Sequence, residues 1–472
     1  MPRLPAPRVS AATVRLLVVV EFLSGTLQGA FPVLLPNLAH ELHFGAGDQA
    51  LVLGVNFLVS GVTVPLSSRL GDLFGHRRLL LATLALTCLG YVVSAAATGL
   101  ALLLVGQALA GVLSCWLPLE FALLRDQLGE ERGGRAVGLL VGSLTLGTIV
   151  GAVARPGLWV MAALPAVSLL VVWRWIPESV TRAPGRVDWH GAILLSLGLG
   201  LLFGGFSSTG TSAGAALISA LLIGGGVLLC LFVRQELRVP APILDVRMLV
   251  RRATAPVFGL SFLLGCALYG AQSPTLSFEA AKPNETGYGL GADAQMLGLL
   301  SLPAVLGALI GALAADRLAR RFGARALLGG GFGLSAAGYA TIAAAHASAA
   351  AFIVPSAAAG FGAGLGLSLL PGLLMRRMPA DQTGIGTGVY NTLKTLAGAA
   401  TGAVGAAVLD AMLLRAGVPT QEAYVTIWLG CALLCALGVP VALMLRGAPL
   451  PASEGRLPAQ TFAHESSSTE SA

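Results

Sequence analysis

The chain has 472 residues, of which 56% are hydrophobic and only 11% are charged, and its formal net charge is +7. Soluble globular proteins carry about 25% charged residues, so this composition excludes an ordinary soluble protein and indicates a membrane protein with many spans. The basic residues are spread through short links between apolar runs instead of gathering on a polar domain, which argues against a nucleic-acid partner.

Fourteen apolar runs are long enough to cross a bilayer, which takes roughly 20 residues of helix. The runs lack the two-residue alternation of a lipid-facing barrel strand, so each is predicted to be an α-helix. The first six lie near residues 14–36, 50–68, 79–98, 100–124, 136–154 and 157–176. The other eight lie near 190–207, 213–234, 255–275, 295–315, 326–345, 350–375, 385–412 and 424–446. The predicted fold class is therefore an all-α polytopic membrane protein.

The predicted helices divide the chain into five segments. An amino-terminal tail (1–13) precedes a six-helix bundle (14–178), and a linker with two extra helices (179–252) joins it to a second six-helix bundle (253–446). Residues 447–472 are rich in Pro, Ser, Glu and Ala, and we expect them to form a disordered tail.

The distribution of Lys and Arg predicts the orientation of the chain, because basic residues gather in the cytoplasmic loops of membrane proteins. With a cytoplasmic amino terminus, all but four of the 29 Lys and Arg lie in the tails and the even-numbered loops. The four exceptions are Arg155, Lys282 and Arg415 outside, and Lys394 within a helix. Both termini are therefore predicted to be cytoplasmic. Scarce Lys beside abundant Ala, Gly and Arg indicates a GC-rich bacterial genome and so a bacterial plasma membrane.

Glycine, at 62 residues, is concentrated in the predicted helices in GxxxG-like spacings. Examples are Gly147 with Gly151 and Gly360 with Gly364. Because small residues let helix backbones approach closely in lipid, we interpret these spacings as sites of helix packing.

A short charged stretch, Ser68–Arg78 (SRLGDLFGHRR), links the second predicted helix to the third. It resembles the cytoplasmic loop signature of major facilitator superfamily transporters, roughly G-x-x-x-D-R/K-x-G-R/K-R/K-R/K. The matching residues are Asp72, Gly75, Arg77 and Arg78. The departures are Ser68, Leu73 and His76. The resemblance implies a gating role in which Asp72 meets the positive amino-terminal end of the thirteenth helix; the alternative is that the stretch only sets topology.

The stretch Ala312–Arg325 (ALAADRLARRFGAR) repeats this pattern in the second bundle, where Asp316, Arg317 and Arg325 become gating candidates. Parallel repeats of this kind are related by an axis along the membrane normal in facilitator transporters. The layout of two six-helix bundles plus a central two-helix hairpin resembles the fourteen-helix drug:proton antiporter branch of that superfamily. The same resemblance adds Arg125 and Asp126, after the fourth helix, to the gating candidates.

Ionisable side chains inside predicted spans are candidate functional residues, because they are costly in hydrocarbon. Glu21, Glu120 and Lys394 lie in the first, fourth and thirteenth spans, and we treat them as candidates for ion coupling. The carboxyl groups are suited to binding a proton or a cationic substrate, while Lys394 needs a carboxylate, carbonyl groups or an anionic ligand. The alternatives are that Glu21 snorkels to a basic loop residue and that Glu120 pairs with Arg125.

In the facilitator fold, cavity-lining helices correspond to spans 1, 4, 9 and 12 of this chain. Together with the polar positions near Lys394, this gives six substrate-binding candidates: Gln28, Gln107, Trp116, Tyr269, Gln272 and Asn391. Gln107 stands where proton-coupled relatives usually carry the Arg of an R-x-x-x-G pattern, and Thr148 replaces the proline of their fifth helix. These departures either remove proton coupling or move it to the three ionisable residues.

The leading interpretation is a secondary transporter that exports lipophilic or amphipathic drug-like compounds or secondary metabolites by alternating access, coupled to protons. One alternative is an importer or uncoupled facilitator, and another is a receptor or scaffold that keeps the fold without transport. No P-loop or other enzyme motif is present, so we expect neither an enzyme nor a cofactor. The expected partners are a small-molecule substrate, protons and the lipid bilayer, and we expect a monomer.

Overall fold

The computed structural model describes residues 11–154, 156–178, 187–208, 214–239, 244, 246–377, 383–415 and 417–445. The side chains of residues 11, 125–138, 375–376, 383–385 and 387 lie outside this description, as does the predicted tail at 447–472.

The amino-terminal half, which we call the N half, contains six helices and one 3₁₀ helix. These are α1 (Ala11–Glu41), α2 (Ala46–Phe74), α3 (His76–Ala95), α4 (Leu100–Ala110), η1 (Gly111–Cys115), α5 (Trp116–Ala154) and α6 (Leu158–Trp175). The central hairpin consists of α7 (Trp189–Ser207) and α8 (Ala215–Glu236), and the short helix α9 (Val246–Val250) follows it.

The carboxyl-terminal half, which we call the C half, repeats this pattern. Its helices are α10 (Ala255–Tyr269), α11 (Gln272–Ala280), α12 (Pro283–Thr286), α13 (Ala294–Phe322), α14 (Ala324–Ala344), α15 (Ala349–Arg377), α16 (Thr383–Ala411) and α17 (Gln421–Leu443). A small antiparallel hairpin of β1 (Leu413–Arg415) and β2 (Val418–Pro419), which the sequence did not predict, precedes α17. Thirteen described helices have the length and composition of a membrane span, and Leu139–Ala154 is a shorter apolar segment, which together account for the fourteen predicted helices.

Two of the predicted spans are interrupted. The fourth consists of α4, η1 and the start of α5, and the ninth consists of α10 followed by α11. Each interruption lies just before a proline, Pro118 or Pro274. Proline has no amide hydrogen, so the carbonyl groups four residues earlier, in Ser114 and Gly270, lose their helical donor. Hydropathy alone does not reveal these breaks.

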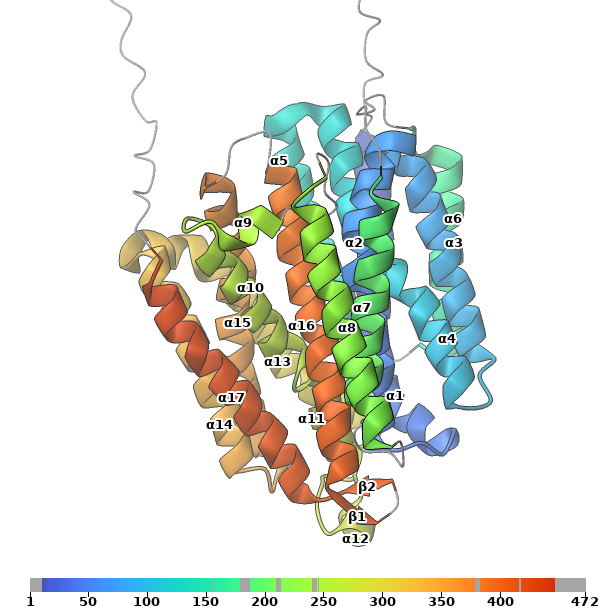
Figure 1. Cartoon of the computed structure of the whole chain (residues 1–472), viewed down its shortest axis with the longest axis vertical. Helices are drawn as coiled ribbons and strands as arrows, with labels where there is room; N and C mark the ends of the chain where they lie inside the picture. The colour runs from blue at the N-terminus through green and yellow to red at the C-terminus, as the bar shows by residue number, and fades with distance from the viewer. Residues whose placement is uncertain are drawn as a thin grey trace, which may run out of the picture.

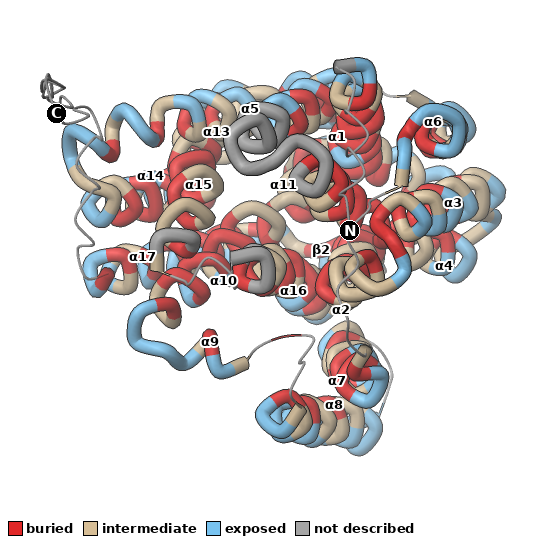
Figure 2. The backbone as a smooth tube through the Cα atoms, turned by 90° about the horizontal axis from the view of Figure 1, so that it is seen from above, coloured by how far each residue is buried: buried red, intermediate tan, exposed pale blue. Residues whose placement is uncertain are grey.

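The two halves lie side by side, and the central hairpin packs against the seam between them (Figures 1 and 2). The seam is formed by α2 of the N half and α16 of the C half, and α7 contacts both helices. Phe203 of α7 packs against Ala399 and Ala403 of α16, and it approaches Gly54 of α2 so closely that a Cβ atom there would lie 2.6 Å from its ring. The hairpin therefore covers a junction between the two halves.

Backbone-to-backbone contact at glycine joins the helices within each half. A Cβ atom at Gly147 of α5 would lie 2.1 Å from the carbonyl oxygen of Phe22 in α1, and one at Gly151 would lie 2.1 Å from that of Thr26. In the C half, Gly360 and Gly364 of α15 approach the carbonyl oxygens of Ala304 and Ala308 in α13 equally closely, at 2.0 Å. The interpretation of these GxxxG-like spacings as packing sites is confirmed.

The halves approach each other closely at the side opposite the chain termini. An even number of crossings puts the start of α1 and the end of α17 on one side (Figure 1), which we call the terminal side. On the opposite side, a Cβ atom at Gly298 of α13 would lie 2.2 Å from the carbonyl oxygen of Ala152 in α5. The carboxylate of Asp410 in α16 lies directly against Gly47 of α2, where a Cβ atom would be 2.0 Å from it. This structure is therefore closed on the opposite side.

The packing of α1 on α5 predicts the effect of adding one methyl group. At Gly29 a Cβ atom would lie 2.0 Å from the carbonyl oxygen of Thr148, whereas at Gly142, on α5, nothing lies within 4 Å. We expect Gly29→Ala to destabilise the protein by about 1–3 kcal/mol through overpacking, and Gly142→Ala to change stability by less than about 0.5 kcal/mol. Thermal unfolding of the purified protein in detergent measures both, and equal effects would contradict this packing.

Candidate functional site

The signature stretch is more helical than the sequence suggested. Residues from Ser68 to Phe74 continue α2, and the helix ends only at Gly75, whose φ of 108° favours glycine. The carboxylate of Asp72 lies 3.3 Å from Nε2 of His76 and is partly exposed. Asp72 is thus paired within its own half in this state.

Glu178, which the sequence analysis did not single out, completes this corner. Its Oε1 accepts a hydrogen bond of 2.9 Å from the backbone amide of Arg77, and its Oε2 lies 3.8 Å from Nε of Arg78. The guanidinium of Arg77 also donates to the carbonyl oxygen of Trp173 in α6, at 2.7 Å. The end of α6 is therefore tied to the start of α3. The sequence did contain a signal for Glu178: it is an acid just after the sixth span, on the same predicted side of the membrane as Arg77 and Arg78.

The repeat in the C half has a glycine turn like that at Gly75, but no described residue takes the place of Glu178 beside it. Gly323 follows α13 with a φ of 81°, but no atom of a described residue lies within 4 Å of a Cβ placed there. Asp316, Arg317 and Arg325 are exposed on the terminal side. The side chains of Arg125 and Asp126 lie outside the described residues, so their gating role stays a prediction.

Glu21 of α1 and Glu120 of α5 are brought together inside the N half. Both side chains are fully buried, at 0% exposure, and they are close enough to interact electrostatically. Within the described part of the chain, neither carboxyl group has a hydrogen-bond partner or a cation within 4 Å. Two carboxyl groups therefore share an enclosed site in which no described residue pairs with either of them.

Two of the predicted substrate-binding residues are enclosed in the N half. Nε2 of Gln107 donates a 3.0 Å hydrogen bond to Oγ of Ser94. Nδ2 of Asn56 donates to the backbone carbonyl of Gln107 at 3.2 Å and to Oε1 of Gln107 at 3.3 Å. Trp116 is fully buried as well. The amide of Gln107 is thus occupied in joining α2, α3 and α4, which makes it a packing residue in this state.

Four other candidates retain exposed surface. Gln28 is exposed although its neighbours along α1 are buried, and its Nε2 donates to Oγ of Ser24 at 3.2 Å. Asn391 of α16 and Gln272 of α11 are partly exposed. Gln28 and Asn391 thus offer exposed surface to a ligand, whereas Oε1 of Gln272 is buried without a partner among the described residues.

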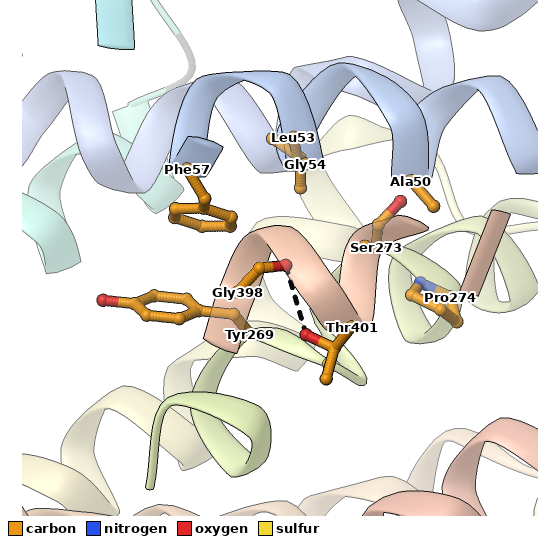
Figure 3. A pocket seen from close by; sticks show the side chains of 11 residues that line it. Ala50, Leu53, Gly54, Phe57, Tyr269, Ser273, Pro274, Gly398 and Thr401 are labelled. Carbon is orange, nitrogen blue, oxygen red and sulfur yellow. Dashed lines mark hydrogen bonds between the residues drawn. The ribbon is translucent and has the colours of Figure 1, made fainter. Parts of the chain in front are cut away.

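The fourth of these candidates, Tyr269, packs against Phe57 of the N half, with ring centroids 4.3 Å apart and ring planes inclined by 37°. Figure 3 shows the two rings beside a small cavity that also includes Ser273, Pro274 and Thr401. The phenol oxygen of Tyr269 points away from Ser273 and Pro274 (Figure 3). This aromatic pair joins α2 to α10 and so bridges the two halves.

Lys394 lies in the C half, on α16, and its side chain is partly exposed. Its Nζ lies 5.6 Å from the centre of the Tyr390 ring, and no carboxylate of a described residue lies within 4 Å of it. The described residues likewise contain no group of three or more His, Cys, Asp or Glu side chains that could hold a metal ion.

Two helical bundles, a charged turn after the second helix of each, and buried ionisable groups define a polytopic membrane protein of the transporter type. A family model described as the Major Facilitator Superfamily matches residues 17–402 and 260–468. The chain belongs to the Major Facilitator Superfamily, which confirms the resemblance found in the sequence.

Three known proteins illustrate the range of its relatives. The chain is 27% identical over 308 residues to a uridine/deoxyuridine transporter of Lactococcus lactis, over 61% of this chain and 63% of the relative. It is 26% identical over 383 residues to a multidrug resistance protein B homolog of Mycobacterium tuberculosis, over 75% of this chain and 67% of the relative. A crystal structure of a variant of the nucleoside transporter NupG matches with a TM-score of 0.65 at 13% identity, over 92% of this chain and all of NupG. The chain thus spans less than two thirds of the uridine/deoxyuridine transporter, and the likeness to NupG shows the fold alone.

The contact between Gly75 and Glu178 predicts that this turn is intolerant of a side chain. A Cβ atom at Gly75 would lie 2.8 Å from Oε1 of Glu178, at a backbone φ that L-residues rarely adopt. We expect Gly75→Ala to lower the yield of folded, monodisperse protein and to lower its melting temperature, because strain of this kind costs about 1–3 kcal/mol. Gly99→Ala, in the next turn, has open space around it and serves as the control. A melting temperature as high for Gly75→Ala as for the control would refute this prediction.

Proposed function

We propose that the chain is a proton-coupled secondary transporter that exports lipophilic or amphipathic small molecules by alternating access. The observation that carries this proposal is the buried pair of Glu21 and Glu120. The similarity to the multidrug resistance protein B homolog supports drug-like compounds as the substrate class.

The chemistry of the pair favours a proton as the coupled ion. Two neighbouring carboxylates that are buried away from bulk solvent repel each other and are poorly hydrated, so a bound proton stabilises the pair. Because the two groups interact, protons bind to the pair as a unit. Substrate binding or a change of access that hydrates the site then releases the proton, and this links proton movement to transport.

Alternating access requires the closed side to open and the terminal side to close. In our proposal the terminal side is cytoplasmic, as the distribution of basic residues predicts. Asp72 then exchanges His76 for the amino-terminal end of α16, where backbone N–H groups carry partial positive charge. This exchange stabilises the state that is closed on the cytoplasmic side.

The similarity to the uridine/deoxyuridine transporter supports a second candidate function, the uptake of a small polar molecule. The amide side chains of Gln28, Gln272 and Asn391, which keep exposed surface, suit hydrogen bonding to such a substrate. The direction of proton-driven flux separates the two candidates, because an exporter loads inside-out vesicles and an importer loads right-side-out vesicles.

Neutralising the carboxyl pair tests proton coupling. Compounds identified in a growth screen of expressing cells are added to inside-out vesicles, and their accumulation is measured with and without a proton gradient. We expect Glu21→Gln and Glu120→Gln each to reduce gradient-driven accumulation about ten-fold or more, because an amide side chain does not bind and release protons near neutral pH. Glu285→Gln, an exposed carboxylate that pairs with Lys282, is the matched control. Full gradient dependence in both test variants would remove the pair from coupling.

The gating role of Asp72 has its own test. We expect Asp72→Asn to express normally but to transport at least about ten-fold more slowly, because a neutral amide interacts far less with a helix terminus than a carboxylate does. The initial rate of transport in the same vesicles, divided by the amount of protein, measures this effect. Normal transport by the variant would leave Asp72 with a topological role only.

A further inference from the structure

Lys394 is a cation in the middle of a membrane span without a visible counterion. It lies 11 residues after the start of α16 at Thr383 and 17 before its end at Ala411. The apolar span within α16, Gly388–Ala411, begins six residues before Lys394, so the ammonium group lies inside the span, roughly 9 Å along the helix from its start. The described residues offer its ammonium group neither a carboxylate nor a hydrogen-bond acceptor.

The backbone around Lys394 is held firmly. A Cβ atom at Gly265 of α10 would lie 2.2 Å from the carbonyl oxygen of Lys394, and one at Gly61 of α2 would lie 2.4 Å from the side chain of Leu396. Helices from both halves therefore pack against this part of α16. The fold therefore sets the backbone position of Lys394, while its side chain remains partly exposed.

Aromatic rings flank the cation along α16. One turn toward the terminal side, the ring of Tyr390 lies 5.6 Å from Nζ. One turn the other way, Gly398 is so close to Phe57 and Tyr269 that a Cβ atom there would lie 3.0 and 2.9 Å from their rings. An apolar or aromatic body beside Lys394 would therefore meet aromatic surface from both halves.

We propose that Lys394 binds the anionic group of the transported molecule, so that the substrates of this protein are amphipathic anions with a carboxylate or sulfonate on an apolar or aromatic body. The inference rests on the proposed transport function and narrows its substrate class. A partly desolvated ammonium group is stabilised when an anion reaches it, and the Tyr390 ring supplies only weak compensation. In this state the Phe57 and Tyr269 rings contact each other beside a cavity of only about 10 Å³, so in our proposal they receive the apolar body when the halves move apart, and a bound substrate then influences the packing of the halves.

Two probes that differ only in charge test this assignment. Binding of 2-naphthoate and of its neutral analogue 2-naphthamide to the full-length protein in nanodiscs is measured by isothermal titration calorimetry, with empty nanodiscs as the blank. We expect the wild type to bind 2-naphthoate about ten-fold more tightly than 2-naphthamide. In Lys394→Met the two affinities should agree within about two-fold, while Lys394→Arg should keep the preference. The chain has one other lysine, Lys282, which lies in an exposed ion pair, so Lys282→Met is the matched control for loss of one positive charge.

A second measurement uses the wild-type protein and so does not depend on the folding of a variant. Acetic anhydride acylates both lysines, and mass spectrometry follows each rate. At about ten times its Kd, 2-naphthoate should slow acylation of Lys394 about ten-fold and leave Lys282 unchanged. The assignment would be overturned by any of four results: equal binding of the two probes, no binding of 2-naphthoate, an anion preference that persists in Lys394→Met, or acylation of Lys394 that 2-naphthoate does not slow. If these binding assays fail while gradient-driven transport still depends on Glu21 and Glu120, the anionic substrate class is wrong and the proposed proton coupling stands. If transport does not depend on the two Glu residues, the proposed proton coupling is wrong, and the binding assays alone decide whether Lys394 binds anions.

Discussion

Contact between a glycine and the backbone carbonyl of a neighbouring helix is the interaction on which this structure depends. Lipid gives helices little hydrophobic reason to associate, so close packing has to hold them together. The same contacts fix the ionisable residues. Glu21 directly precedes Phe22, whose carbonyl oxygen meets Gly147, and the carbonyl oxygen of Lys394 meets Gly265. The backbones of Glu21 and Lys394 are therefore anchored at helix crossings, which limits how far these residues can move to find a partner.

The three ionisable residues predicted to lie inside membrane spans have different surroundings in the two halves. The two carboxyl groups of the N half share an enclosed site, whereas the ammonium group of the C half keeps some exposed surface. In our account the first site binds the coupled proton and the second binds the substrate. The seam between α2 and α16 and the Phe57–Tyr269 pair lie between the halves, so a rocking motion of the halves changes the surroundings of Lys394 directly.

Hydropathy predicted the helices and glycine spacing predicted which helix faces pack closely, because each pattern is formed by residues near one another in sequence. The helix breaks before Pro118 and Pro274 were missed, since apolar composition continues through them. The role of Glu178 was missed although its position after the sixth span was a signal, because Arg77 is 101 residues away in the chain. The enclosed amide of Gln107 could not be predicted, because its partner Asn56 is 51 residues away. Glu21 and Glu120 were recognised singly, but only packing of α1 on α5 brings them together.

The central claim is that protonation of the Glu21–Glu120 pair controls which side of the protein is open. Spin labels on Glu41→Cys and Leu414→Cys, both exposed on the side that is closed here, report the separation of the halves by electron–electron double resonance once the accessible native cysteines Cys88 and Cys230 are replaced by Ala. Our account predicts a distance distribution that changes with pH in the otherwise wild-type protein. It also predicts that Glu21→Gln combined with Glu120→Gln holds the low-pH distribution at every pH. A distribution that is independent of pH, or a pH response that survives in the double Gln variant, would contradict it.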